Sequence, residues 1–511
     1  MINAANREIP EYIEGYGAVK PYRGPFATPP SGRVAGGKVS KDMPKSEKLL
    51  KSIDQAIDAV GLKDGMTISF HHHFRSGDYV LGMVLEAIAR KGIKGLTLFP
   101  SSLPDRSDPL VPFLNQGVVT AVMTSGVRGP AGRRLTEGLS VPTVIRSHGG
   151  RARAIESGDA KIDVAFIGAP TCDIYGNING INGKSACGSL GYAKVDAAYA
   201  DKVVAVTDNL VQHHIYPISV PQSQVDYIVP VDCIGDPKGI ATAALRMSRD
   251  PRDLLIAKTA ADVIEHSGYF KDGWAFQLGG GGASLAVAGF IRKKMLARKI
   301  TGDFGMGGIG AVFVDMLEEG LFEMAFDGQT FDQRAVESMR KNLNHVEMSA
   351  SQYANPHSRG PLVNDLDAVV LGATEIDVDF NVNGVTDSNG VLMGASGGQS
   401  DTAAGAKLAI VAAPLLRGRL PIILDRVHTV VTPGETVDVI VTDQGTAVNP
   451  RRADLIDRLK DAGIPLVSIE DLRKRAYRIA GGPGPIPVGE KIVGVVEYRD
   501  GTVIDVVRKP L

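Results

Sequence analysis

The sequence predicts an α/β protein with two duplicated, open and mainly parallel α/β domains, flanked by an N-terminal arm and a C-terminal extension. Three observations lead to this prediction. The chain has 511 residues, which is too long for a single hydrophobic core. Short β-branched runs alternate with amphipathic helices, the pattern of a parallel sheet. Blocks of sequence in the first half also recur in the second half in the same order.

The internal repeat can be followed by eye. Lys63-Asp64-Gly65 recurs as Lys271-Asp272-Gly273, 208 residues further along the chain. Residues 163–180 align without gaps with residues 367–384, at an offset of 204, and seven of the eighteen pairs are identical. Chance matching of a Gly/Asn-rich turn would not keep both the order and the near-equal offset, so we interpret the repeat as a duplication.

Four segments follow from this alignment. Residues 1–48 are rich in Pro and Gly and weakly periodic, which is typical of an extended arm. Residues 49–235 form the first half, and residues 236–420 form the second half. Residues 421–511 are not duplicated, and we expect strands, a helix and a closing hairpin there, with Asp500-Gly501 as the turn signal.

The composition excludes several classes of protein. Lys and Arg number 56 against 57 Asp and Glu, a net charge of -1, which argues against broad attraction to nucleic acid or anionic membranes. The three cysteines have no Cys-x-x-Cys spacing, which suits a reducing compartment. The longest strongly apolar run, residues 408–416, is far shorter than the ~20 residues of a membrane helix. The first 20 residues carry charges and no apolar core, so we expect no signal peptide there. We therefore predict a cytoplasmic protein.

Ligands of an open parallel sheet bind beyond the carboxyl ends of its strands, so two facing sheets would bring such loops into one cleft. The loop that precedes the first helix after the repeated Lys-Asp-Gly differs in composition between the two halves. The second half has Gly279-Gly280-Gly281-Gly282, where the first half has His71-His72-His73-Phe74 followed by Arg75. Glycines let backbone N–H groups approach an oxyanion at a helix N-terminus, whereas the His/Arg loop offers side-chain donors and positive charge. We expect backbone contacts from Gly279, Gly280 and Gly281, and a polyanionic small molecule at the other loop.

The three consecutive histidines do not predict a metal site. Neighbouring residues of an extended segment point to opposite sides, so at most two of them could share one ion. The arginines that cluster near the strand ends of the first half fit a multiply charged carboxylate better, although surface solvation accounts for part of them. The candidate ligands of the polyanion are His72, Arg75, Arg128 and Arg146.

One carboxylate is present in only one of the two copies. Glu375 stands at a strand end, where the first copy has Thr171. Because carboxylates can attack acyl groups to form anhydrides, Glu375 is a candidate catalytic residue, with a turn or helix-capping acid as the alternative. The Gly-rich segment 394–401 is not a Walker A loop, and tight turns would explain it equally well. Beside Glu375, the amides of Gly397 and Gly398 are candidates for an oxyanion cradle.

Residues 372–401 resemble the acetate and 4-hydroxybutyrate CoA-transferases, in which an active-site Glu in an Ala-x-Glu-x-Asp context precedes a Gly-x-Gly-Gly-x-x-Asp loop. Across nearly the whole chain, including the N-terminal arm and the loop 71–75, the sequence resembles the citrate lyase alpha subunit family more closely. The resemblance implies CoA-transferase-type domains. It also implies the reaction acetyl-carrier + citrate → citryl-carrier + acetate, with activity toward CoA esters such as acetyl-CoA.

The resemblance also implies partners. A beta subunit would cleave the citryl-carrier, a gamma subunit would be the acyl carrier with a CoA-like phosphopantetheine arm, and this subunit would form homo-oligomers and bind no cofactor. Glu375 would act either covalently, as in the ordinary CoA-transferases, or beside a direct attack of citrate in a ternary complex. An acetate/4-hydroxybutyrate-type CoA-transferase, an acyl-CoA hydrolase and a non-catalytic ligand sensor are the alternatives. The duplication and the position of Glu375 argue against the sensor.

Overall fold

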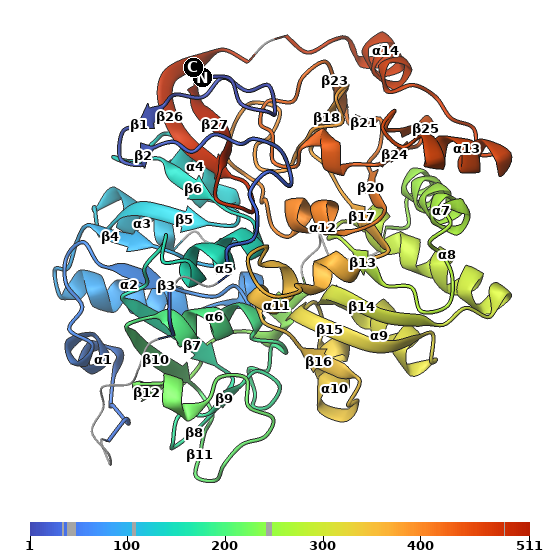
Figure 1. Ribbon diagram of the computed structural model, residues 1–511. Helices are drawn as coiled ribbons and strands as arrows, with labels where there is room; N and C mark the ends of the chain where they lie inside the picture. Colours follow the sequence, from blue (N-terminus) through green and yellow to red (C-terminus); the bar gives the residue numbers. More distant parts are fainter. Residues whose placement is uncertain (33–34, 38–46, 105–108, 242–247, 485) are drawn as a thin grey trace.

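The computed structural model describes residues 1–32, 35–37, 47–104, 109–241, 248–484 and 486–511. Two large sheets, built mainly from the two halves of the sequence, lie side by side with helices on their faces (Figure 1). Their central strands, such as β7 (Val164–Ala169) and β17 (Ala368–Leu371), are apolar and almost fully buried. Continuous apolar strands of this kind are typical of parallel sheets that are covered on both faces.

The first sheet contains nine described strands in the order β12-β10-β7-β3-β4-β5-β6-β26-β27. Besides β7, its strands from the first half are β3 (Thr67–Ser69), β4 (Leu96–Leu98), β5 (Val119–Thr124), β6 (Thr143–Ile145), β10 (Lys202–Thr207) and β12 (Tyr227–Pro230). The helices of this half are α1 (Ile53–Ala59), α2 (Val80–Arg90), α3 (Leu110–Asn115), α4 (Gly129–Thr136), α5 (His148–Glu156) and α6 (Gly191–Tyr199).

The second sheet contains eight described strands in the order β16-β15-β14-β13-β17-β20-β24-β25. Besides β17, these are β13 (Phe276–Leu278), β14 (Gly302–Ile309), β15 (Phe322–Thr330), β16 (His345–Glu347), β20 (Ala409–Ala412), β24 (Val439–Thr442) and β25 (Gly445–Val448). The helices are α7 (Pro251–His266), α8 (Gly282–Arg298), α9 (Ala311–Glu318), α10 (Gln333–Lys341), α11 (Ala350–Ala354), α12 (Gln399–Gly405), α13 (Ala453–Asp461) and α14 (Ile469–Ala480). None of the helices in the described ranges is long and apolar enough to cross a membrane.

The topology confirms the predicted duplication. The order 12-10-7-3-4-5-6 of the first sheet recurs as 24-20-17-13-14-15-16 in the second, and every neighbouring pair in both series is parallel. Each half also carries a small sheet with the same register, in which Thr171 pairs with Asn179 and Glu375 pairs with Asn383. The small sheets consist of β8 (Thr171–Asp173), β9 (Ile178–Asn179) and β11 (Leu210–Val211), and of β18 (Glu375–Asp377), β19 (Val382–Asn383) and β23 (Ile423–Leu424).

The second repeat extends beyond the expected boundary at residue 420. Its last strand is β24 (Val439–Thr442), which occupies the same place in the second sheet as β12 does in the first. The segment after residue 420 therefore completes both large sheets. Its predicted hairpin forms β26 (Val488–Glu497) and β27 (Val503–Pro510), and β26 pairs in parallel with β6 of the first sheet. The N-terminal arm packs on this hairpin, where the Asn3 amide donates to the carbonyl oxygens of Val503 and Ile504 (Figure 1).

The remaining regular segments are short. They are the paired strands β1 (Tyr12–Ile13) and β2 (Gly17–Ala18), the paired strands β21 (Leu416–Arg417) and β22 (Leu420–Pro421), and 3-10 turns at Arg75–Gly77, Gln222–Gln224, Pro237–Ile240, Leu362–Asp365 and Gly434–Thr436.

A buried ion pair joins the C-terminal hairpin to the first sheet. Arg146, just after β6, donates from Nε to Glu497 Oε2 at 2.6 Å and from Nη2 to Glu497 Oε1 at 2.8 Å. Both side chains are buried, and Arg153 Nη2 lies 3.9 Å from the same carboxylate. This bidentate geometry satisfies the Arg146 guanidinium from within the fold.

We expect Glu497→Ala to destabilise the fold by about 3–5 kcal/mol, because it leaves the buried Arg146 without a counter-charge. The urea midpoint of unfolding measures the loss. Glu319→Ala breaks the exposed bidentate pair with Arg292 and serves as the matched control, which should change the midpoint little. Equal midpoints for the two variants would contradict the anchoring role of Glu497.

Candidate active site

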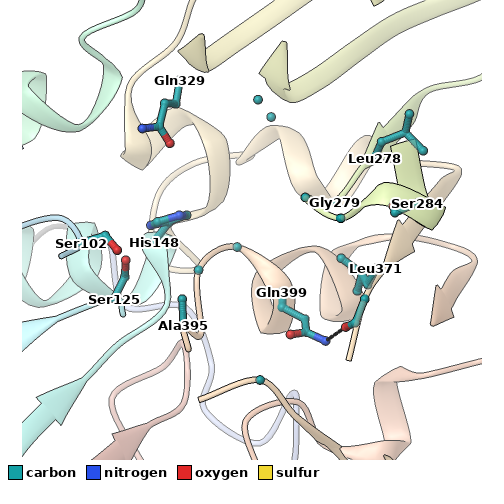
Figure 2. Close-up of a pocket in the computed structure, with 18 of the residues that line it drawn as sticks. Ser102, Ser125, His148, Leu278, Gly279, Ser284, Gln329, Leu371, Ala395 and Gln399 are labelled. Atoms are coloured by element: carbon teal, nitrogen blue, oxygen red, sulfur yellow. Dashed lines mark hydrogen bonds between the residues drawn. The ribbon is translucent and has the colours of Figure 1, made fainter. Parts of the chain in front are cut away.

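A cavity of about 570 Å³ lies between the two halves, at the carboxyl ends of their strands. Figure 2 shows Ser102, Ser125 and His148 on one side of it and Gly279 and Ser284 on the other. The lining residues of the first half are His72, Arg75, Ser76, Ser102, Pro104, Ser125, Arg128, His148 and Tyr192. The second half contributes residues 277–284, 372–374 and 395–399, with Gly328, Gln329, Phe331 and Tyr353 among others. The cleft expected from two facing sheets is present.

Two arginines give the first-half wall its charge. Arg75 lines the cavity from the turn after β3, and its guanidinium lies 4.6 Å from the centroid of the Phe331 ring. Burial and the nearby Arg128 lower the pKa of Arg75 to about 10, so it stays charged at neutral pH. Neither Arg75 nor Arg128 forms an ion pair with a carboxylate among the described residues. The buried Asp327 acts on Arg75 from a distance and favours its charged form. A wall with two arginines and no ion pair among the described residues favours an anionic ligand.

A stack of aromatic rings continues this wall. His72 Nδ1 lies 2.6 Å from Ser101 Oγ, and its ring centroid is 4.8 Å from that of Tyr192, which in turn lies 4.6 Å from His148. Burial and the neighbouring arginines lower the pKa of His148 to about 3, and burial with His148 lowers that of His72 well below its usual range. Both imidazoles are therefore neutral at pH 7 and offer hydrogen bonds without charge.

Much of the second-half wall is glycine backbone, beside the side chains of Asp253 and Arg417, which also line the cavity. The Gly279 N–H donates to Val370 O at 2.7 Å, whereas the N–H groups of Gly280 and Gly281 donate to none of the described residues. Gly281 is the N-cap of α8 with φ of 131°, a conformation that side-chain-bearing residues rarely adopt. Free amides at the N-terminus of a long helix favour an anion or a developing oxyanion.

The second Gly-rich segment also lines the cavity, but only part of the expected cradle is available. The Gly397 N–H donates to Ser125 O at 3.3 Å, and its carbonyl accepts from the His148 N–H at 2.7 Å. The backbone of Gly397 therefore joins the two halves, while the Gly398 N–H has no acceptor among the described residues. A Cβ at Gly398 would lie 2.3 Å from Tyr353 Oη, so only glycine fits there.

Two of the expected site residues lie outside the cavity lining. Glu375 is 2% exposed and does not line the cavity, although Thr374 does. Its Oε2 accepts from Asn383 Nδ2 at 2.9 Å and from the His428 N–H at 3.1 Å. Neighbouring residues of an extended segment point to opposite sides, so Glu375 points away from the cavity that Thr374 lines. Arg146 is likewise absent from the lining, since its guanidinium pairs with Glu497.

The side chains of the three consecutive histidines, residues 71–73 (the histidine loop), point alternately away from and toward the cavity. His72 faces the cavity, whereas His71 Nε2 lies 2.9 Å from the buried Asp196, and the His73 ring stacks on His71. Across the described residues, no three His, Cys, Asp or Glu side chains are grouped to hold a metal ion. His148 and Gln329 line the cavity but are not among the site residues predicted from the sequence. Their positions could have indicated them, because His148 follows the end of strand β6 and Gln329 lies near the end of strand β15.

A buried carboxylate fixes the two halves beside the cavity. Asp401 of α12 accepts from Ser147 Oγ at 2.8 Å and from the Gly149 N–H at 2.9 Å, both at the start of α5. Arg499 Nε lies 3.6 Å from the same carboxylate. Burial raises the pKa of Asp401 to about 6 in spite of these partners.

Comparison with known proteins shows extensive similarity. A family model described as "Citrate lyase, alpha subunit (CitF)" matches residues 46–510. The citrate lyase alpha chain of Haemophilus influenzae is 54% identical over 464 residues, which are 91% of this chain and 93% of the relative. The corresponding chain of Klebsiella pneumoniae is 53% identical over 471 residues, 92% of this chain and 93% of the relative.

Solved structures agree. The alpha subunit of citrate lyase from Streptococcus mutans, described in complex with citrate, superposes with a TM-score of 0.96 at 51% identity and covers 100% of both chains. The malonate decarboxylase alpha subunit of Acinetobacter baumannii shares the fold, with a TM-score of 0.63 at 14% identity over 86% of this chain and 93% of that chain.

Asp401 gives a pH test of the junction between the halves. A carboxyl group whose pKa is raised on folding binds its proton more tightly in the folded state, so its contribution to stability falls as the pH rises from about 4 to 6. Asn at this position cannot ionise. We therefore expect the difference in unfolding free energy, wild type minus Asp401→Asn, to decrease between about pH 4.5 and 6.5 and to be flat above. Urea unfolding across this range measures it. A difference that rises with pH would contradict the dominance of burial over Arg499.

Proposed function

Because the chain belongs to the citrate lyase alpha subunit family, it is a transferase component of citrate lyase, and we propose that the cavity between its halves is the site of transfer. The role of this family is to exchange the acyl carrier between acetate and citrate, within a multisubunit complex. The observation that carries the proposal is the contrast between the two walls. The first-half wall presents Arg75 and Arg128, which form no ion pair with a described residue. The second-half wall presents glycine amides that donate to no described acceptor, next to Asp253 and Arg417.

Citrate would occupy the first-half wall. Its three carboxylates need cationic partners, and Arg75 and Arg128 line the cavity without ion pairs to described residues. The neutral imidazoles of His72 and His148 supply further hydrogen bonds. The S. mutans relative, described in complex with citrate, supports this ligand class. We leave Arg146 out of the proposed ligand set because Glu497 occupies its guanidinium.

The acyl thioester would occupy the second-half wall. A thioester carbonyl gains negative charge as it is attacked, and the free N–H groups of Gly280, Gly281 and Gly398 line the cavity where such charge would develop. Gly279 contributes backbone shape to this wall, since its own N–H is used by Val370.

We propose that transfer proceeds directly between the two ligands. A carboxylate oxygen of citrate attacks the acetyl carbonyl carbon, and the carbon–sulfur bond breaks to release the carrier thiolate and a mixed anhydride. The thiolate then attacks the citryl carbonyl carbon, and the carbon–oxygen bond to acetate breaks. Citryl-carrier and acetate result, with no net proton or electron change.

The position of Glu375 supports the direct route over a covalent glutamyl intermediate. Its carboxylate is held by Asn383 and His428 and does not line the cavity. In the direct route Glu375 is a positioning residue. Its carboxylate holds the Asn383 side chain, and the Asn383 carbonyl oxygen accepts from the N–H of the lining residue Thr374 at 2.9 Å. The covalent route would require the carboxylate to leave both partners and enter the cavity.

Membership of this family supports further inferences about the carrier, the lyase subunit and the cellular location. We infer that the carrier is a gamma subunit whose phosphopantetheine thioester enters this cavity, that a beta subunit performs the cleavage, and that the alpha subunit is homo-oligomeric in the complex. Free CoA esters carry the same thioester end and should serve as substrates. The three cysteines are unpaired, which supports a reducing cytoplasmic location.

The test follows acetate and citryl-CoA after mixing the chain with acetyl-CoA and citrate. We expect both products in equal amounts, and Glu375→Gln should keep kcat within about tenfold of wild type, since a carboxamide oxygen can still accept from Asn383 and His428. Treatment with borohydride in the presence of acetyl-CoA alone should leave the enzyme active.

Other outcomes would identify other mechanisms. Loss of transfer in a folded Glu375→Gln variant, together with borohydride inactivation before citrate is added, would establish the covalent route. Acetate with free thiol and no citryl-CoA would establish a hydrolase, and no reaction with either CoA ester or carrier would favour a ligand sensor.

A further inference from the structure

The side chain of Arg75 is held by the second half of the chain. Its backbone has φ of 49°, an uncommon value for a residue with a side chain, at the turn that follows the histidine loop. Its Nη2 donates to Gln329 Oε1 at 3.0 Å, and its guanidinium lies over the Phe331 ring. Both partners belong to the end of β15 or the residues that follow it. A first-half cation is therefore aimed by second-half side chains.

Gln329 uses both ends of its carboxamide in this contact. Besides accepting from Arg75, it donates from Nε2 to the His72 carbonyl oxygen at 2.8 Å. The two partners fix the orientation of the amide, because a guanidinium can only donate and a carbonyl can only accept. Gln329 is 4% exposed and lines the cavity (Figure 2). One neutral side chain thus holds two of the residues that form the cationic wall.

The neutrality of Gln329 matters as much as its geometry. A glutamate of the same length would also accept from Arg75, but it would cancel the cavity charge and place a carboxylate oxygen against the His72 carbonyl. A glutamine orients the guanidinium and leaves its positive charge for a ligand. Among the described residues, no carboxylate pairs with Arg75.

We propose that Gln329 is a positioning residue that sets the specificity of the cavity for a polycarboxylate, by aiming Arg75, which forms no ion pair with a described residue, across the junction of the two halves. The proposal rests on the proposed function, in which this wall receives citrate. It assigns to the second half, which carries the thioester wall, a part in recognising the acid substrate.

Gln333 provides a matched control from the same half. It also reaches across to the first half, donating from Nε2 to the carbonyl oxygens of Ala186 at 3.3 Å and Pro237 at 2.9 Å. It does not line the cavity and contacts neither Arg75 nor His72. Gln333→Glu therefore makes the same chemical change in another bridge between the halves.

The experiment measures citrate binding by titration calorimetry, and the KM values for citrate and acetyl-CoA, in the full chain. Gln329→Glu should weaken citrate binding and raise its KM by about tenfold or more, because it neutralises Arg75, while the KM for acetyl-CoA stays within about twofold. Gln329→Met, which loses orientation but keeps the charge, should have a smaller effect in the same direction. Gln333→Glu should match wild type.

Arg75→Met separates the inference from its premise. If Arg75→Met leaves citrate binding unchanged, the assignment of this wall to citrate is wrong and the inference falls with it. If Arg75→Met weakens citrate binding but both folded Gln329 variants bind normally, the inference alone is wrong. Equal increases in both KM values for the Gln329 variants, or a Gln333→Glu defect of the same size, would reduce Gln329 to a structural bridge and overturn the proposal.

Discussion

The junction between the two halves is the constraint on which the site depends. Asp401 of the second half accepts hydrogen bonds from Ser147 and Gly149 at the start of α5. A Cβ at Gly149 would lie 2.1 Å from Ala354 O, so the two halves meet there with backbone against backbone. This junction holds the carboxyl ends of two parallel sheets face to face. The cavity lies between these loops, at the carboxyl ends of the strands of both halves.

Duplication explains how one cavity obtained two chemically different walls. Equivalent strand-end loops entered it from both halves, so each could change without disturbing the strand order of its sheet. In the first half the loop carries Arg75, and in the second half the equivalent loop carries a run of glycines before the N-terminus of α8. A charged acid and a thioester need this contrast, because ionic partners suit the first and oriented amides suit the developing charge of the second.

The fold and part of the site were predictable because they depend on local pattern. Strand periodicity and the repeat indicate the two sheets, and loop composition indicates the two walls. Glu375, Arg146 and Gly397 could not be placed this way. Their hydrogen-bond partners lie far away in the sequence, so no short motif predicts them. Glu375 accepts from the His428 N–H, Arg146 pairs with Glu497 in the C-terminal hairpin, and the Gly397 N–H donates to Ser125. The place of Gln329 at the end of a strand could be predicted, but its role could not, because it arises only from contacts with Arg75 and His72 in the opposite half.

A crystal structure of this chain with citrate tests the central claim most directly. The account predicts citrate in the cavity between the halves, with its carboxylates within hydrogen-bond distance of Arg75 and Arg128, and with Arg146 still paired to Glu497 and Glu375 still held by Asn383 and His428. Citrate bound on the glycine wall with no contact to either arginine, or at a freed Arg146 outside the cavity, would contradict it.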